Sequence, residues 1–251
     1  MALGMPDKID TLIFDLGGTL YKPLENLVDV ARTHLIEAGI KECEYRSKDE
    51  IEAALDWHRN DWLVNYMLEN NVEPRWEPTR DLWIEYDRKL LEVLCINGDL
   101  DKLATAYQSK WDEYLDRVKP ELVDGCREGL EKLHSLGYKL GIASNRFGDP
   151  TKYLAKDGIA DLFGAVEYTA VPGYAKPSPY LLLSVAKQLG SNPMRCLYVG
   201  NLVNDDVTAA RRASMQPVIL VWCNPEQREL VPDDTWLIEH IDDLEGKLRE
   251  S

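Results

Sequence analysis

Residues 11–20 read Thr11-Leu-Ile-Phe-Asp-Leu-Gly-Gly-Thr-Leu20, an apolar run that ends in an acid and a pair of glycines. A short, continuously apolar run of β-forming residues is typical of a strand buried on both faces of a parallel sheet. Asp15 falls at the carboxyl end of this strand, where ligands bind in open α/β sheets. Gly17 and Gly18 provide a backbone that can turn sharply and approach a ligand closely. The stretch predicts a carboxylate directed into a crevice, although an aspartate here could instead cap the following turn.

The charge of the chain limits its partners. The 251 residues carry a formal net charge of −15 at pH 7, with an isoelectric point near 4.7. Because a nucleic-acid backbone or an anionic membrane surface would repel such a chain, we expect no nucleic-acid partner and no membrane partner. An anionic substrate would therefore have to be bound by local positive charge.

The sequence also indicates a compartment. No run approaches the roughly 18 apolar residues of a membrane span, and no basic flank followed by a long apolar core is present. The five cysteines form no C-x-x-C pair and the four histidines lie far apart. This pattern is typical of small buried thiols in a reducing compartment rather than of a disulfide or zinc framework. We therefore predict a cytoplasmic protein.

Two kinds of periodicity divide the chain. In residues 21–118, apolar side chains recur at spacings of three and four, which predicts helices. From residue 119 to the end, helical and strand patterns alternate, which predicts a mostly parallel sheet with helices on both faces. We therefore expect a Rossmann-like, doubly wound α/β core made of residues 1–20 and 119–251, with residues 21–118 inserted as an all-helical domain.

Polar side chains lie in four loops at predicted strand ends. They are Asp15, Ser144 with Asn145, Lys176, and Asn201 with Asp205 and Asp206. Because the carboxyl ends of parallel strands meet at one edge of a sheet, these groups are expected to converge although they are far apart in sequence.

Four stretches carry a family resemblance. They are Phe14-Asp-Leu-Gly-Gly-Thr-Leu20, Ala143-Ser-Asn145, Lys176-Pro-Ser-Pro179 and Val199-Gly-Asn-Leu-Val-Asn-Asp-Asp-Val207. In this order they resemble the four motifs of the haloacid dehalogenase-like hydrolase superfamily, and the helical insert resembles its type-one cap. The resemblance spans almost the whole chain.

The resemblance implies a magnesium-dependent phosphatase that acts on a small phosphorylated metabolite. Asp15 would be the nucleophile, and water would hydrolyse the resulting aspartyl phosphate. Lys176 and Ser144 would stabilise the transferring group, on which negative charge develops. Asn145 and the Gly18 backbone would complete the substrate site. A lysine before a proline is otherwise a common surface residue, and Ser-Asn after a strand is common turn chemistry.

Two positions depart from the pattern of the family phosphatases. Gly17 stands where those enzymes usually have a second aspartate, the general acid and base, whose loss typically costs a factor of about 10² to 10⁴. The chain would then favour a substrate with a good leaving group, or an acid supplied by Tyr21, Glu25, the insert or the substrate. Asn201 stands where an aspartate usually binds magnesium.

The implied magnesium site is therefore weakened. Its ligands would be Asp15, the Gly17 carbonyl, Asn201 and Asp206, with Asp205 as a further candidate. A neutral amide holds a hard cation less strongly than a carboxylate does. The acids at positions 205 and 206 could instead only match the dipole of the following helix.

Two other functions remain open. The first is a metal-free hydrolase of the 2-haloacid dehalogenase kind, in which Arg59 would bind the halide. The second is a non-catalytic descendant that binds a phosphorylated ligand or a protein. The joint presence of Asp15, Ser144 and Lys176 favours an enzyme, because no structural requirement explains all three.

Overall fold

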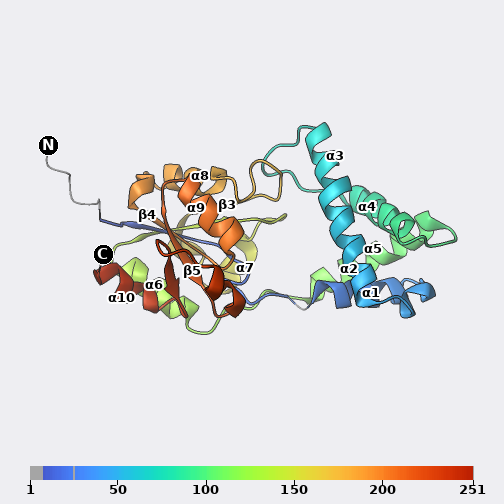
Figure 1. Cartoon of the computed structure of the whole chain (residues 1–251), viewed down its shortest axis with the longest axis horizontal. Helices are drawn as coiled ribbons and strands as arrows, with labels where there is room; N and C mark the ends of the chain where they lie inside the picture. Colours follow the sequence, from blue (N-terminus) through green and yellow to red (C-terminus); the bar gives the residue numbers. More distant parts are fainter. Residues whose placement is uncertain (1–7, 25, 251) are drawn as a thin grey trace. The chain divides into compact units, whose positions relative to one another are not determined.

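The computed structural model describes residues 8–24 and 26–250, except for the side chains of residues 57–60 and 250. The chain divides into two compact units (Figure 1). The α/β unit consists of the residues up to Pro23 and from Pro120 onward, and the helical unit consists of Leu24–Lys119. The predicted crossings at residues 20/21 and 118/119 lie within three residues of these borders.

In the described part of the α/β unit, six strands form one parallel sheet. They are β1 (Thr11–Phe14), β2 (Lys139–Ser144), β3 (Phe163–Tyr168), β4 (Cys196–Gly200), β5 (Gln216–Leu220) and β6 (Trp236–Ile238). Their order in the sheet is β3-β2-β1-β4-β5-β6, and every neighbouring pair is parallel. The chain winds in one direction from β1 to β3 and in the other from β4 to β6. This confirms the doubly wound sheet and puts its switch point beside β1.

Helices cover both faces of the sheet (Figure 1). One face packs against α6 (Cys126–Ser135), α7 (Thr151–Lys156) and α10 (Asp243–Glu250), and the other packs against α8 (Tyr180–Gln188) and α9 (Thr208–Arg212). Ile13 and Phe14 are both fully buried and belong to different clusters, because successive side chains of a strand point to opposite faces. The continuous apolar run of β1 follows from this double coverage.

Short helical segments connect these elements. They are η3 (Ala160–Leu162), η4 (Pro193–Arg195), η5 (Val203–Val207) and η6 (Pro225–Leu230). The loop after β4 does not lead directly into α9, because a π-helical turn, η5, precedes that helix. This wider turn contains Asp205 and Asp206.

The helical unit contains no strand among its described residues. Its elements are α1 (Leu27–Glu37), η1 (Lys41–Glu44), α2 (Lys48–His58), η2 (Arg59–Leu63), α3 (Val64–Glu69), α4 (Arg80–Val93) and α5 (Leu100–Arg117). Thr79 and Asp99 cap α4 and α5 by accepting hydrogen bonds from Leu82 N and Lys102 N. Leu90 and Tyr107 are central in the core of this unit. None of the described helices is both long and apolar enough to cross a membrane.

Candidate active site

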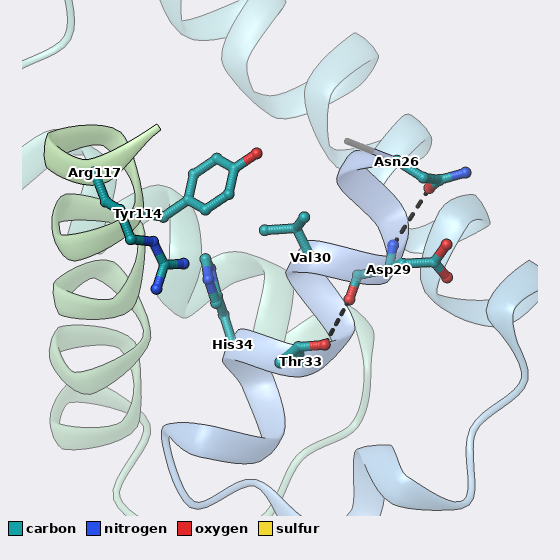
Figure 2. Close-up of a pocket in the computed structure, with 7 residues that line it drawn as sticks. All are labelled: Asn26, Asp29, Val30, Thr33, His34, Tyr114 and Arg117. Atoms are coloured by element: carbon teal, nitrogen blue, oxygen red, sulfur yellow. Dashed lines mark hydrogen bonds between the residues drawn. The ribbon is translucent and has the colours of Figure 1, made fainter. Parts of the chain in front are cut away.

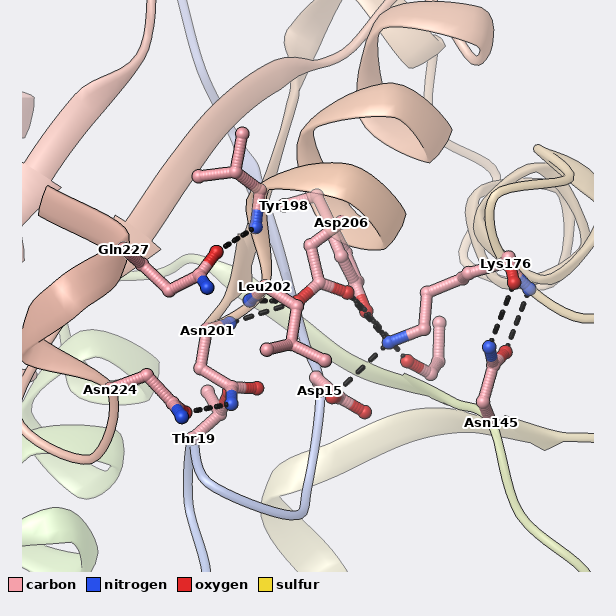
Figure 3. Close-up of polar contacts among 12 residues, drawn as sticks. Asp15, Thr19, Asn145, Lys176, Tyr198, Asn201, Leu202, Asp206, Asn224 and Gln227 are labelled. Carbon is pink, nitrogen blue, oxygen red and sulfur yellow. Dashed lines mark hydrogen bonds and ion pairs between the residues drawn. The ribbon is translucent and has the colours of Figure 1, made fainter. Parts of the chain in front are cut away.

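The predicted site residues of four loops meet at the carboxyl end of β1 (Figure 3). The Asp15 backbone N–H donates to Val199 O at 2.9 Å, so β1 and β4 stay paired up to the residue that carries the carboxylate. The side chains that converge here are buried, with exposed fractions between 1% and 8%: Asp15, Ser144, Lys176, Asn201 and Asp206. The doubly wound topology thus brings together residues from both halves of the sheet, as expected.

Lys176 links two carboxylates. Its Nζ lies 3.1 Å from Oδ2 of Asp15 and 2.7 Å from Oδ1 of Asp206. The side chains of Lys176 and Asp206 are each 2% exposed, and that of Asp15 is 12% exposed. A buried ion pair must be well hydrogen-bonded to offset the desolvation of its charges, and Lys176 and Asp206 meet this requirement.

Asp206 is fixed beneath the loop that follows β4. Its Oδ2 accepts from the backbone N–H groups of Asn201 and Leu202, both at 2.9 Å. A Cβ at Gly200 would lie 2.2 Å from the Asp206 carboxylate, so the glycine permits this close approach. Both Asp206 oxygens are therefore engaged by protein donors.

For both Asp15 and Lys176, burial and the charge of the ion-pair partner shift the pKa in opposite directions. The pKa of Asp15 is raised overall: burial is the largest cause and the Asp206 carboxylate adds to it, and together they outweigh the Lys176 ammonium and the Ser144 hydroxyl, which lower it. Burial disfavours the charged form of Lys176, but Asp15 and Asp206 together outweigh it and raise the pKa of Lys176. Lys176 is therefore an ammonium at neutral pH, as a group that neutralises a carboxylate must be.

One oxygen of Asp15 has no partner. Its Oδ1 is buried and has no hydrogen-bond partner among the described residues. A buried carboxylate oxygen without a donor is costly, and such an atom is expected to have a function. This oxygen retains the lone pairs that a nucleophile or a cation ligand needs.

Asn145 holds the loop that carries Lys176. Its Nδ2 donates to Lys176 O at 2.9 Å, and its Oδ1 accepts from Lys176 N at 2.7 Å (Figure 3). Both polar atoms of the side chain therefore contact the Lys176 backbone. A direct contact between Asn145 and a substrate stays a prediction.

Asn201 packs against Gly18. Its Oδ1 accepts from the Thr19 hydroxyl at 3.3 Å, and its Nδ2 donates to Asn224 Oδ1 at 2.6 Å. Gly18 has a φ of 73°, and a Cβ there would lie 2.5 Å from Asn201 Nδ2. Only a glycine at position 18 therefore fits both this backbone conformation and this neighbour.

Gly17 is in a different situation from Gly18. Its φ lies outside the left-handed region, and a Cβ at position 17 would meet no atom within 4 Å. The backbone would thus accept a side chain where the family phosphatases usually have their general acid. In this chain, position 17 therefore supplies no general acid, although the structure has room for one.

Two predicted substitutes for this acid (Tyr21 and Glu25), the predicted halide ligand (Arg59) and one predicted magnesium ligand (Asp205) are placed as follows. The Tyr21 hydroxyl donates to Asp157 Oδ2 at 2.9 Å, and burial together with Asp157 raises the pKa of Tyr21 well above its usual value. Glu25 and the side chain of Arg59 lie outside the described residues. Asp205 is half-buried, and burial and Asp206 raise its pKa.

The structure adds three residues to the predicted set: Thr19, Tyr198 and Asn224. Tyr198 lies in β4 and is fully buried, and its hydroxyl contacts Lys176 Nζ at 2.8 Å. The sequence signal for it is a tyrosine in a buried strand directly before a motif, because a buried tyrosine hydroxyl usually has a partner. The contacts of Thr19 and Asn224 with Asn201 have no comparable signal.

A separate cavity of about 300 Å³ lies within the helical unit (Figure 2). Its lining comes from α1 and its N-cap and from the last turns of α5, and includes His34, Tyr114 and Arg117. Burial lowers the pKa of His34, and the Arg117 guanidinium contributes to this shift. The sequence did not indicate this cavity.

Comparisons with known proteins identify relatives in sequence and in fold. A phosphoglycolate phosphatase of Nitrosococcus oceani is 28% identical over 84% of this chain and 83% of its own length. A glyceraldehyde 3-phosphate phosphatase of Methanopyrus kandleri is 26% identical over the same shares. The crystal structure of a 2-haloacid dehalogenase from Pseudomonas syringae has a TM-score of 0.66 at 18% identity, covers 96% of this chain and 99% of its own, and is similar in fold.

The family itself follows from a match that covers most of the chain. The model of the haloacid dehalogenase-like hydrolase family matches residues 9–214, which include β1, the helical unit and the loops around Lys176 and Asp206. The chain therefore belongs to the haloacid dehalogenase-like hydrolase family, and the prediction of a hydrolase of this family is confirmed.

Proposed function

We propose that this hydrolase is a phosphatase that acts on a small phosphorylated molecule, with Asp15 as its nucleophile. The arrangement of the Asp15 carboxylate carries the proposal. Its Oδ2 lies 3.1 Å from Lys176 Nζ, and its Oδ1 has no partner among the described residues. The relatives named as phosphoglycolate and glyceraldehyde 3-phosphate phosphatases support the reaction class.

The proposed reaction has two steps. The free oxygen of Asp15 attacks the phosphorus atom, and the bond from phosphorus to the leaving oxygen breaks with its electron pair, which leaves an aspartyl phosphate. Water then attacks the phosphorus, and the bond to the Asp15 oxygen breaks to release phosphate and restore the carboxylate. Lys176 favours the ionised form of Asp15 and offsets part of the charge that accumulates, while Ser144 donates to a phosphoryl oxygen.

The charge of the chain makes this local cation important. At a net charge of −15, the protein repels phosphate esters at long range. Lys176 is the buried cation beside Asp15, and its position between two carboxylates keeps it charged. Substrate binding is therefore expected to depend on close contacts and to be only weakly favoured by long-range attraction.

A magnesium ion would supply further positive charge, and the site has donors that fit it. Asp15 Oδ1 has no partner among the described residues, and Asn201 Oδ1 accepts only one long hydrogen bond, from Thr19. Together with the Gly17 carbonyl, these oxygens are the kind of ligand that magnesium prefers. Asp205 and Asp206 would contribute mainly negative charge, since both oxygens of Asp206 already accept hydrogen bonds.

The donor set predicts weak binding of this ion. Among the described residues, no three His, Cys, Asp or Glu side chains are grouped so that they could hold a metal. One carboxylate, one amide and one carbonyl carry a single negative charge between them. We therefore expect magnesium to activate the enzyme at high rather than low concentrations.

The absence of a side chain at Gly17 narrows the set of good substrates. A leaving alkoxide needs a proton in the transition state, whereas an aryl oxide or another stabilised anion does not. The Tyr21 hydroxyl already donates to Asp157, so it is a poor substitute. We expect esters with good leaving groups to react fastest.

The test is hydrolysis of an activated aryl phosphate and of a panel of ordinary phosphate esters, with and without magnesium. The native chain and Asp15→Asn are compared, with Asp10→Asn as the matched control, because Asp10 lies at the other end of β1 and pairs with Arg195. We expect magnesium-stimulated turnover that Asp15→Asn abolishes and Asp10→Asn retains. No turnover on any ester would contradict the proposal, and halide release from a 2-haloacid would then identify a dehalogenase.

A further inference from the structure

The ammonium group of Lys176 has no free hydrogen-bond donor. Three acceptors surround Nζ: Asp206 Oδ1 at 2.7 Å, the Tyr198 hydroxyl at 2.8 Å and Asp15 Oδ2 at 3.1 Å. An ammonium has three N–H groups, so these acceptors use all of them. Tyr198 therefore supplies the third acceptor that fixes Lys176, beside the two carboxylates.

The direction of the hydrogen bond between Tyr198 and Lys176 follows from a third contact. The Tyr198 hydroxyl oxygen lies 2.9 Å from Ala143 O, and a carbonyl can only accept. The single hydroxyl proton is thus donated to Ala143, and the oxygen accepts from Lys176. The contact of 3.4 Å to Asp206 Oδ1 is longer and would require the same proton.

This hydrogen-bonded chain crosses the catalytic strand. Tyr198 belongs to β4 and Ala143 belongs to β2, and β1, which ends at Asp15, lies between these two strands. The phenol therefore ties both neighbours of β1 to the lysine that contacts Asp15. Tyr198 is fully buried, so water does not compete for these contacts.

We propose that Tyr198 is a positioning residue for Lys176: its hydroxyl accepts one N–H and so directs the other two at Asp206 and at Oδ2 of Asp15. This keeps Lys176 away from Asp15 Oδ1, which stays free to react. The inference rests on the proposed phosphatase reaction. Tyr198 itself contacts no reacting atom.

The loss of the hydroxyl has a specific consequence. In Tyr198→Phe one buried N–H of Lys176 loses its acceptor, and a buried donor without a partner seeks another. The Asp15 oxygen without a partner belongs to a carboxylate that Lys176 already contacts, so it is available as an acceptor close to Nζ. Lys176 would then occupy the lone pairs of the attacking oxygen. Attack slows, while the groups that bind the substrate remain.

The experiment measures kcat and KM of Tyr198→Phe with an activated aryl phosphate and magnesium, together with the thermal unfolding midpoint. We expect kcat to fall about tenfold, the loss expected for one hydrogen bond to a charged group, with KM changed less than about twofold. Tyr107→Phe is the matched control, because Tyr107 is also fully buried but lies in the helical unit. It should keep the native kcat.

A graded substitution separates positioning from folding. Fluorinated tyrosines at position 198 keep the ring and the hydroxyl but make its oxygen a weaker acceptor. We expect kcat to fall step by step with each fluorine while the unfolding midpoint stays near the native value. A crystal structure of Tyr198→Phe should show Lys176 Nζ moved toward Asp15 Oδ1.

The outcomes distinguish this inference from the proposed function. No phosphatase turnover by the native chain, or turnover that survives Asp15→Asn, overturns both. Turnover that requires Asp15, combined with a native kcat in Tyr198→Phe and in the fluorinated series, overturns the inference alone. A rise in KM at unchanged kcat would also overturn it, because it would assign Tyr198 to substrate binding.

Discussion

Nζ of Lys176 lies 2.7 Å from Oδ1 of Asp206, and both side chains are almost completely buried. The pair joins the loop after β3 to the turn after β4, so it also fixes the edge of the sheet around Asp15. Removing one partner of a buried pair leaves the other charge unpaired, which typically costs about 3–5 kcal/mol. The pair is therefore expected to contribute to stability as well as to chemistry.

Lys176→Met tests this expectation. We predict that it lowers the free energy of unfolding by about 3 kcal/mol or more, because Asp15 and Asp206 are left facing each other without a cation. Lys22→Met is the matched control. Lys22 pairs with Glu121 at the surface, where water screens the pair and its contribution to stability is small. Urea unfolding of both variants measures the difference, and equal effects would refute the structural role of Lys176.

Gly17→Asp should add the missing acid. A Cβ at position 17 meets open space, so the variant is expected to fold normally. We predict an increase of at least about tenfold in kcat on unactivated alkyl phosphates and little change on an activated aryl phosphate, since only the alkoxide needs a proton.

Gly18→Asp is the control for the Gly17 variant. Its φ of 73° and the close contact with Asn201 predict strain, a lower unfolding midpoint and lower turnover on every ester. If the two variants changed turnover and the unfolding midpoint equally, an acid at position 17 would have no role in catalysis.

Asn201→Asp should strengthen the magnesium site. A carboxylate in place of the amide adds one negative charge to the predicted ligands, so half-maximal activation is expected at about tenfold lower magnesium, equivalent to about 1.4 kcal/mol. Asn224→Asp is the control, since Asn224 contacts Asn201 but is not a predicted ligand. Titration of turnover with magnesium measures both, and an unchanged midpoint in Asn201→Asp would remove Asn201 from the ligand set.

The buried carboxyl of Asp87 in α4 is expected to make the free energy of unfolding depend on pH. It is 3% exposed, its Oδ2 has no hydrogen-bond partner among the described residues, and burial with Asp112 raises its pKa to about 8. Between pH ~4, where the unfolded chain loses this proton, and pH ~8, the folded state binds it more tightly. The free energy of unfolding therefore falls by about 1.4 kcal/mol per pH unit on account of Asp87.

Asp87→Asn removes the pH-dependent contribution of Asp87 to the free energy of unfolding. We expect the variant to match the native chain near pH 4 and to be clearly more stable at pH 8, as measured by thermal unfolding across this range. Asp56→Asn, at an exposed position of α2, should change nothing. A native-like pH profile in Asp87→Asn would mean that Asp87 is ionised in the folded protein.

The sequence predicted the sheet and the convergence of its loops because both depend on patterns along the chain. A continuous apolar run fits only a strand covered on both faces, and alternation of helices and strands favours one parallel winding. Asp15, Ser144 and Lys176 could be identified because each follows a recognisable strand or loop. These features need no knowledge of side-chain direction.

The contacts that orient the site could not be predicted in the same way. Tyr198 has the sequence pattern of a core residue, and only the three-dimensional structure shows that its hydroxyl reaches Lys176 and Ala143. The engagement of Asn201 by Thr19 depends likewise on the sharp turn at Gly18. The burial of Asp87 could be predicted only in part. Its spacing of three and four residues from Leu90 and Leu91 places it on the buried face of α4, but the sequence does not show that its Oδ2 lacks a hydrogen-bond partner among the described residues.

The central claim is that Asp15 forms a covalent phosphoryl intermediate. The most direct measurement is rapid acid quenching during turnover of an activated aryl phosphate, followed by mass spectrometry of the peptide that contains Asp15. We predict a phosphoryl adduct on Asp15 that hydroxylamine removes and that is absent in Asp15→Asn. Because Gly17 leaves the hydrolytic water without a base, the adduct should be readily populated. Turnover without any adduct, or an adduct on another residue, would contradict the account.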